Sequence, residues 1–156
     1  MSSLVVAFDQ LTKWPIVRWI KLGDIPIEVN SFLYIVRRHN EGAAWSFLAD
    51  AGGWQRWFFI VLASTVSAYI VYWMWAIRNE GNTVLSAGLA LVLGGAVGNL
   101  VDRIHYGHVI DFIDVYFARW NYHFPAFNVA DSAITVGAVL LIVDALFISG
   151  RQTASN

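Results

Sequence analysis

Long apolar runs alternate with short polar stretches along this chain of 156 residues. Residues 57–77 and 83–101 carry no charged side chain, and residues 130–149 carry only Asp131 and Asp144. A helix needs about 20 mainly apolar residues to cross a bilayer, because each residue adds about 1.5 Å to a hydrocarbon core about 30 Å thick. The three runs are therefore predicted to be membrane-spanning helices.

A fourth run, residues 3–20, is less apolar because it carries Asp9, Lys13 and Arg18 and has Pro15 in its interior. Asp9 and Lys13 are four residues apart, so a helix places them on one face, where each lowers the other's cost of burial. With this run as the first span, the chain is predicted to be an all-α polytopic membrane protein with four transmembrane helices.

Four spans place both termini on one side of the membrane and residues 21–56 and 102–129 on the other, within a single membrane-embedded domain over residues 1–156. The first of these segments contains IPIEVNSFLYIVRRHN, whose β-branched and aromatic residues predict one or two strands at the membrane surface. Lys and Arg side chains are more numerous on this side than on the side of the termini. Charge alone would therefore place the termini outside the cell.

Composition supports the membrane class and excludes several kinds of chemistry. Hydrophobic residues make up 58% of the chain and charged residues 13%, whereas soluble domains are about a quarter charged. Without cysteine there is no disulfide, no thiolate nucleophile and no Cys-based metal site. The net charge is −1 and no basic run is longer than Arg37-Arg38, so nothing indicates a nucleic-acid partner.

Polar residues gather where the third apolar run ends and the fourth begins. Asn99, Asp102 and Arg103 share one helical face, Asp111 follows in VIDF, and Asp131 opens the last helix. If these two helices pack side by side, Asp111 and Asp131 lie near the same membrane surface. Two carboxylates in one site cannot both ionise easily, so the pair holds a single proton. Such a dyad can activate water and protonate a carbonyl oxygen, which predicts peptide hydrolysis without a metal or other cofactor.

Each of these residues also has a purely structural interpretation. Asn128 can cap the last helix with Asp131 three residues on, as in a capping box. Asp102 and Arg103 can form a surface ion pair. The remaining polar residues near the span ends form no HxxxH or HExxH pattern and are interpreted as interfacial or peripheral, with Asp114 facing solvent: His105, His108, His123, Asp114 and Asp144.

Two other functions compete with peptide hydrolysis. A proton or cation pathway would use Asp9, Asp102, Asp111 and Asp131, but it predicts acids spread through the depth of the bilayer rather than gathered at one face. A membrane scaffold whose acids only cap helices predicts that Asp111→Asn and Asp131→Asn leave every activity intact. Gly94 with Gly98 indicates close helix packing rather than chemistry.

Five motifs cover most of the chain: DQLTK at 9–13, HNEGAAWSF at 39–47, GGAVGNLVDRI at 94–104, GHVIDF at 107–112 and FPAFNVADSAITVG at 124–137. In this order and spacing they resemble the bacterial lipoprotein signal peptidases, also called signal peptidase II. The resemblance implies an inner-membrane aspartyl peptidase with four spans and cytoplasmic termini. It also implies a small β-structured cradle and a short interfacial helix on the outer face.

The resemblance further implies the substrate and the residues of the site. The substrates would be prolipoproteins with a diacylglyceryl group on a cysteine, cleaved just before that cysteine, and the catalytic aspartates would be Asp111 and Asp131. Asp9 and Lys13 match a structural polar pair in the first helix of the family. Positions that support the dyad or contact the bound substrate or inhibitor fall on Asn40, Gly42, Asn99, Asp102, Arg103 and Asn128.

The implied partners follow from this site. Membrane lipids would surround the helices, and the substrate's acyl chains would stay in the bilayer while its scissile bond meets the aspartates where water is available. Cyclic peptides of the globomycin type would lodge between Asp111 and Asp131. We expect a monomer, because the dyad needs only one chain, and no cofactor. The chain departs from the family pattern in its short first span, in the run Arg37-Arg38-His39 and in a third acid, Asp114, beside the site.

Overall fold

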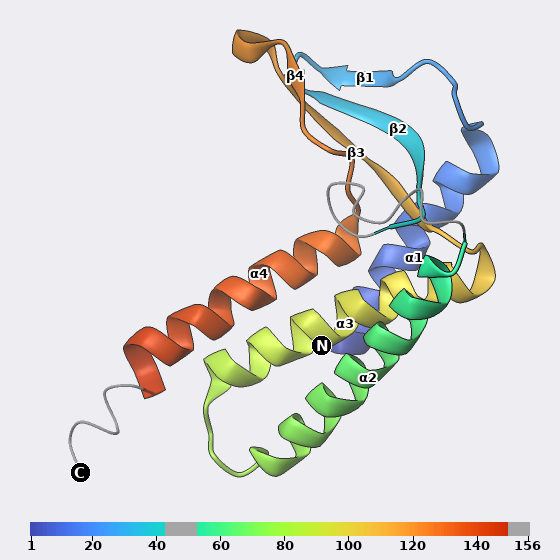
Figure 1. Ribbon diagram of the computed structural model, residues 1–156. Helices are drawn as coiled ribbons and strands as arrows, with labels where there is room; N and C mark the ends of the chain where they lie inside the picture. The colour runs from blue at the N-terminus through green and yellow to red at the C-terminus, as the bar shows by residue number, and fades with distance from the viewer. Residues whose placement is uncertain (43–52, 150–156) are drawn as a thin grey trace.

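The computed structural model describes residues 1–42 and 53–149, which form four long helices and one small sheet (Figure 1). The helices are α1 (Ser2–Trp19), α2 (Gln55–Ala76), α3 (Thr83–His105) and α4 (Val129–Val143), with a π-helical continuation, η3 (Asp144–Ser149). The antiparallel sheet has the order β1-β2-β3-β4. Its strands are β1 (Ile27–Asn30), β2 (Leu33–Asn40), β3 (Val109–Phe117) and β4 (Tyr122–His123), with the short turn η2 (Ala118–Trp120) between the last two.

Apolarity predicted the positions of the helices, and all four lie where they were expected. Within the described residues, three helices are long and apolar enough to cross a membrane: Gln55–Ala76, Thr83–His105 and Val129–Ile148. The first helix is not among them, because it carries three charged side chains, so a fourth span stays a prediction. The molecule is thus a helical protein of membrane type with an antiparallel sheet.

The sheet differs in part from expectation. The strands predicted between residues 21 and 56 are confirmed as β1 and β2, which pair antiparallel. The strand β3 was not predicted, yet it carries Asp111. Residues 43–47 of the HNEGAAWSF motif lie outside the described residues, and the short interfacial helix that the resemblance implies stays a prediction.

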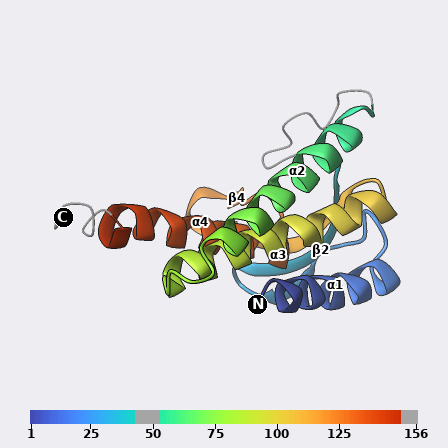
Figure 2. The same cartoon turned by 90° about the horizontal axis from the view of Figure 1, so that it is seen from below.

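Helix α3 lies at the centre of the bundle, with α1 and α2 on opposite sides of it (Figure 2). Small residues on α3 allow this close approach, as predicted for Gly94 and Gly98. A Cβ atom at Gly94 would meet Val5 of α1, and one at Gly98 would meet Asp9 of α1 and Ala130 of α4. The end of α3 therefore contacts both the first helix and the start of the last one.

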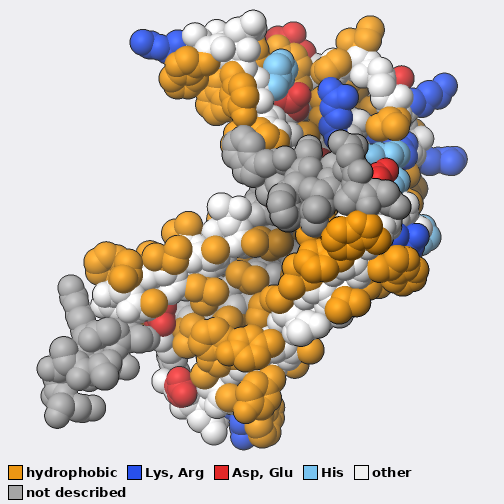
Figure 3. All heavy atoms as spheres, viewed as in Figure 1, with side chains coloured by type: hydrophobic (Ala, Val, Ile, Leu, Met, Phe, Trp, Pro, Cys, Tyr) orange, Lys and Arg blue, Asp and Glu red, His pale blue; other side chains and the backbone are white. Residues whose placement is uncertain are grey.

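Hydrophobic side chains cover the exposed surfaces of the helices, while basic and histidine side chains gather around the sheet (Figure 3). In an apolar stretch of 18 residues within α2, only 11% of the residues are buried inside the protein. An apolar helix surface of this kind is stable in a lipid environment, where it needs no protein cover. The fold therefore fits a protein embedded in a membrane at its helices.

The strand β3 joins the sheet to the helices. It pairs with β2, where Asn40 lies opposite Val109, and it follows α3 after a turn at Gly107, whose φ of 87° favours glycine. On its other side, Ile113 and Phe127 exchange two backbone hydrogen bonds, 2.9 and 3.0 Å long. Because Phe127 leads directly into α4, these bonds fix the start of α4 beside β3.

Candidate active site

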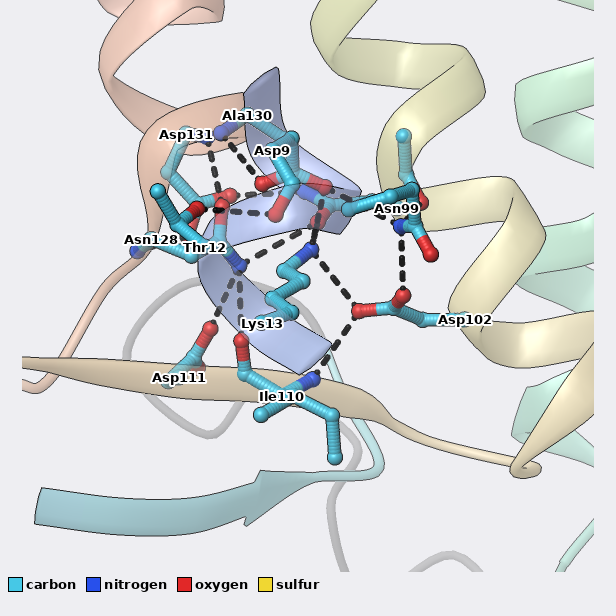
Figure 4. A network of polar contacts seen from close by, with 12 residues as sticks. Asp9, Thr12, Lys13, Asn99, Asp102, Ile110, Asp111, Asn128, Ala130 and Asp131 are labelled. Atoms are coloured by element: carbon cyan, nitrogen blue, oxygen red, sulfur yellow. Dashed lines mark hydrogen bonds and ion pairs between the residues drawn. The ribbon is translucent and has the colours of Figure 1, made fainter. Parts of the chain in front are cut away.

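The two candidate aspartates come from different elements and meet at one asparagine (Figure 4). Asp111 lies in β3 and is 2% exposed, whereas Asp131 lies in the first turn of α4 and is partly buried. The Asn128 amide donates to Asp111 Oδ1 at 2.7 Å, and its backbone N–H donates to Asp131 Oδ2 at 3.2 Å. Asn128 Oδ1 accepts from the Asp131 backbone N–H at 2.9 Å, which completes the predicted capping box. The helix cap and the link between the aspartates are thus the same residue.

Two further amides complete the surroundings of this pair. Asn40 Nδ2 donates to Asp111 Oδ2 at 3.0 Å, and Asn99 Nδ2 donates to Asp131 Oδ1 at 2.8 Å. Across the described part of the chain, neither carboxylate forms an ion pair with a Lys, Arg or His side chain. Each aspartate is therefore hydrogen-bonded to neutral donors, and Lys13 acts on the charge of Asp111 only through space, without an ion-pair contact.

This environment changes the acidity of Asp111. Burial in the protein is the main cause and the charge of Asp131 the second, and together they raise the pKa of Asp111 to about 7. The amides of Asn40 and Asn128 act in the opposite direction, because they stabilise the ionised form, but they do not outweigh burial. Asp111 can therefore hold a proton near neutral pH.

An ion-paired cluster, here called the brace, lies next to the aspartates and consists of Asp9, Lys13 and Asp102. The Lys13 ammonium is 2.7 Å from Asp9 Oδ2 and 2.7 Å from Asp102 Oδ2, and it donates to Asn99 Oδ1 at 3.1 Å. An ammonium group can only donate, so it fixes the Asn99 amide with its oxygen towards Lys13 and its NH₂ group towards Asp131. The brace therefore determines which group of Asn99 faces the aspartate.

The two acids of the brace also hold the backbone beside each candidate aspartate. Asp9 Oδ1 accepts from the backbone N–H of Ala130 at 2.9 Å, directly before Asp131. Asp102 Oδ2 accepts from the backbone N–H of Ile110 at 3.1 Å, directly before Asp111. Both acids have 0% exposure, so these bonds are shielded from water. The brace positions β3 and α4 relative to each other.

Three residues differ from what the sequence indicated. The interpretation of Asp102 and Arg103 as a surface ion pair is wrong, because Asp102 is buried against Lys13. Arg103 instead donates to the Gly42 carbonyl at 2.8 Å, and its guanidinium carbon lies over the ring of Phe59, 5.0 Å from the ring centroid. Asp114 was expected to face solvent but is 7% exposed and lies 2.8 Å from His123 Nδ1.

Two residues of the site were missed. Gln10 donates to Asp102 Oδ1 at 2.9 Å. It lies three residues before Lys13, so a helix places both side chains on one face, and this spacing could have identified Gln10. Arg56 donates to the carbonyls of Arg103 and Ile104, both at 3.0 Å, and so caps the end of α3 from α2. Nothing in the local sequence indicates this role, because the two segments are far apart in the chain.

Within the described ranges, no group of three or more His, Asp or Glu side chains is placed to hold a metal ion. The groups gathered around the aspartates are amides and backbone N–H groups, which suit a peptide or a water molecule rather than a metal ion. The site can therefore donate and accept protons at two carboxyl groups that are linked through Asn128.

An apolar helical bundle with two carboxyl groups brought together at one end is the arrangement expected of a membrane-embedded enzyme, and comparisons with known proteins identify its family. Residues 1–147 match the family Signal peptidase (SPase) II. The lipoprotein signal peptidase of Cupriavidus taiwanensis is 57% identical over 145 residues, which are 93% of this chain and 80% of that protein. That of Acinetobacter baumannii is 50% identical over 156 residues, 100% of this chain and 86% of that protein.

A solved bacterial membrane enzyme has the same fold, with a TM-score of 0.81 and 37% identity over 93% of this chain and 84% of its own. A second one gives a TM-score of 0.78 at 36% identity, over 95% of this chain and 91% of that chain. The chain belongs to the signal peptidase II family and is a peptidase.

Proposed function

We propose that this peptidase removes the signal peptide from diacylglyceryl-modified prolipoproteins by cutting just before the lipidated cysteine, with Asp111 and Asp131 as its catalytic pair. One observation supports this above all: a single asparagine, Asn128, contacts both carboxyl groups, and neither forms an ion pair within the described residues. Two acids held side by side without a cation share a proton, which is the arrangement that aspartic peptidases use.

The proposed reaction uses the two groups in opposite protonation states. The carboxylate of Asp131 takes a proton from a water molecule, whose oxygen attacks the scissile carbonyl carbon. Protonated Asp111 donates to the carbonyl oxygen, so a neutral tetrahedral intermediate forms. When this intermediate collapses, the C–N bond breaks, the cysteine nitrogen takes the proton from Asp131, and Asp111 recovers its own. No covalent bond to the enzyme is needed.

The membrane orients the substrate relative to the two aspartates. The apolar surfaces of α2, α3 and α4 fit the hydrocarbon core, and the aspartates lie where the sheet meets the helices, Asp111 in β3 and Asp131 at the start of α4. A lipidated substrate whose acyl chains stay in the bilayer presents its scissile bond at this boundary, and anchoring reduces the entropy lost on binding. We place the protein in the bacterial inner membrane with the site towards the outer face and α1 as the fourth span.

Two of the basic residues counted on the side of the sheet have structural roles at helix ends. Arg37 donates to the carbonyls of Val17 and Ile20, at 3.1 and 3.0 Å, and therefore caps the end of α1. Arg56 caps α3 in the same way. These cations belong to a folded part of the protein, whereas the positive-inside rule applies to short loops. Without these two residues the side of the sheet still carries more basic residues than the side of the termini, so the proposed orientation rests on the family and not on the charge count.

The placement of the acids supports a peptidase over a proton or cation pathway. Asp9, Asp102, Asp111 and Asp131 are linked through one set of hydrogen bonds at one end of α3. A pathway needs groups spaced through the depth of the membrane. We propose that globomycin-type cyclic peptides bind between the aspartates of the monomeric enzyme.

Cleavage of a diacylglyceryl-modified lipobox peptide, followed by mass spectrometry, tests this function. In Asp111→Asn and in Asp131→Asn the cleavage rate is expected to fall by about 10²-fold to 10⁴-fold, which is the range that a positioned acid or base contributes. Asp114→Asn is the matched control, because Asp114 is a buried acid of the same strand that contacts His123 instead. Turnover of either dyad variant at the wild-type rate, or cleavage at another bond, would contradict the proposal.

A further inference from the structure

Two histidine rings are stacked beside the site without contacting the aspartates. His39 lies in β2 and His108 in the turn before β3, with ring centroids 3.7 Å apart and planes inclined by 21°. The ring of Tyr106 also lies near His108, with centroids 6.2 Å apart and planes inclined by 29°. The stack therefore joins the end of β2 to the turn that leads into β3.

The position of His39 in β2 connects the stack to the candidate dyad. His39 precedes Asn40, whose side chain points to the opposite face of the strand and donates to Asp111 at 3.0 Å. In the ladder, His39 lies opposite Ile110 and Asn40 opposite Val109. The contact between the two rings therefore stabilises the pairing of β2 with β3, and this pairing also holds Asn40 against Asp111.

The contacts of the two rings favour their neutral forms. His39 Nε2 lies 3.2 Å from Arg37 Nε, and a guanidinium group can only donate, so this ring nitrogen must be an acceptor. His108 Nε2 is buried and has no hydrogen-bond partner within the described residues. A proton there would create a buried charged donor without an acceptor. Protonation of either ring thus removes a favourable contact or adds an unfavourable one.

The charges that face the rings act in both directions. Burial is the main cause that lowers the pKa of His39, followed by His108 and Arg37, while Glu41 raises it. Burial also lowers the pKa of His108, as does Arg37, and Asp102 of α3 raises it. The net direction is the same for both rings, so both stay neutral at pH values where an exposed histidine is already partly charged.

We propose that the neutral stack of His39 and His108 is a positioning device for Asn40, and that protonation of the stack separates β2 from the turn before β3 and slows cleavage. The inference rests on the proposed role of Asp111. Because Asn40 acts on the dyad and not on the bound lipid, acid should lower kcat and leave KM almost unchanged.

The pH profile of cleavage tests the proposal. Because both rings stay neutral where an exposed histidine is already partly charged, the wild-type kcat is expected to hold at a pH of about 6.5, the ordinary pKa of histidine. It should fall only at lower pH, by up to about tenfold for each further pH unit. The variant His39→Phe/His108→Phe keeps two stacked rings that cannot take up a proton. At pH 8 the kcat of this variant is expected within about threefold of the wild-type kcat. At pH 5.5 the variant should keep a fraction of its pH 8 rate that is several times larger than the fraction kept by the wild type.

His123→Phe provides the matched control. His123 belongs to β4 of the same sheet and contacts Asp114, and its side chain is 52% exposed. Its replacement should leave the acid side of the profile unchanged. An acid fall of kcat in the double variant that matches the wild type would overturn the proposal.

A titration of the wild-type rings by NMR decides the question even if the double variant does not fold. The chain has four histidines, so ¹³C labelling of the imidazoles gives few signals, and single Phe variants assign them. His39 and His108 are expected to gain protons over the same pH interval in which kcat falls. Rings that stay neutral throughout that interval would refute the proposal. If Asp111→Asn were still active, the proposed dyad would fail, but the titration of the two rings would be unaffected.

Discussion

Two asparagines cap helices at opposite ends of the α3–α4 pair, and their contacts are nearly identical. Asn82 Oδ1 accepts from the backbone N–H of Leu85 at 3.0 Å, and its amide donates to Asp144 at 2.6 Å. Asn128 Oδ1 accepts from the backbone N–H of Asp131 at 2.9 Å, and its amide donates to Asp111 at 2.7 Å. Each asparagine therefore joins a helix cap to a buried acid.

The two ends differ in the number of acids that the capping asparagine contacts. The third residue of α3 is Leu85, whereas the third residue of α4 is Asp131, so Asn128 contacts two acids and Asn82 one. The brace around Lys13 is present at the Asn128 end as well. A capped helix with a buried acid is thus an ordinary structural feature, and the second acid turns the same geometry into a candidate catalytic site.

Loss of the brace should have the largest effect. In Lys13→Met, Asp9 and Asp102 remain buried without their shared cation, and breaking a buried ion pair costs about 3–5 kcal/mol. Thermal unfolding in detergent is expected to show a much lower melting temperature or no folded protein. Lys21→Met, at an exposed lysine, is the control and should melt like the wild type. A Lys13→Met protein that melts normally would mean that the brace contributes little.

The two caps can be separated by matched substitutions. Asn82→Ala and Asn128→Ala each remove a cap, which costs about 1 kcal/mol of stability. Only Asn128→Ala also releases two acids, so its cleavage rate should fall about 10²-fold, as expected when catalytic groups lose their alignment. The rate in Asn82→Ala should stay within about threefold of the wild type. Equal losses of activity in both variants would mean that capping alone explains the role of Asn128.

A further effect, on stability, should appear in Asp111→Asn. The pKa of Asp111 rises from 3.8 to about 7 on folding, so the folded protein keeps a proton that the unfolded chain releases. This stabilises the wild type fully below pH 3.8, and the stabilisation is lost as the pH rises through about 7. The melting temperature of the wild type should therefore fall relative to that of Asp111→Asn over this interval. A constant difference between the two proteins at all pH values would contradict the assigned pKa.

Local patterns predicted those features of the site that depend on neighbours in the sequence. Apolar runs gave the helices, the four-residue spacing gave the pair Asp9 and Lys13, and the spacing from Asn128 to Asp131 gave the capping box. These features depend only on helical geometry. The motifs that indicated the family placed both candidate aspartates on the residues that the fold brings together at Asn128.

Contacts between distant segments could not be predicted in this way. The ion pair proposed for Asp102 and Arg103 failed because adjacent helical residues do not face each other, and the partner of Asp102 is on another helix. Asp114 was expected to face solvent, but it lies in an inner strand of the sheet. It is an odd number of residues from Asp111, so it points to the opposite face, where His123 covers it.

The protonation of the paired aspartates is the central claim, and infrared spectroscopy of the carboxyl groups tests it most directly. Between about pH 5 and 9 the wild type is expected to show one protonated carboxyl band that disappears near pH 7, in keeping with the pKa of Asp111. The band should be absent from Asp111→Asn and present in Asn82→Ala. A wild-type spectrum without such a band, or an identical band in Asp111→Asn, would contradict the account.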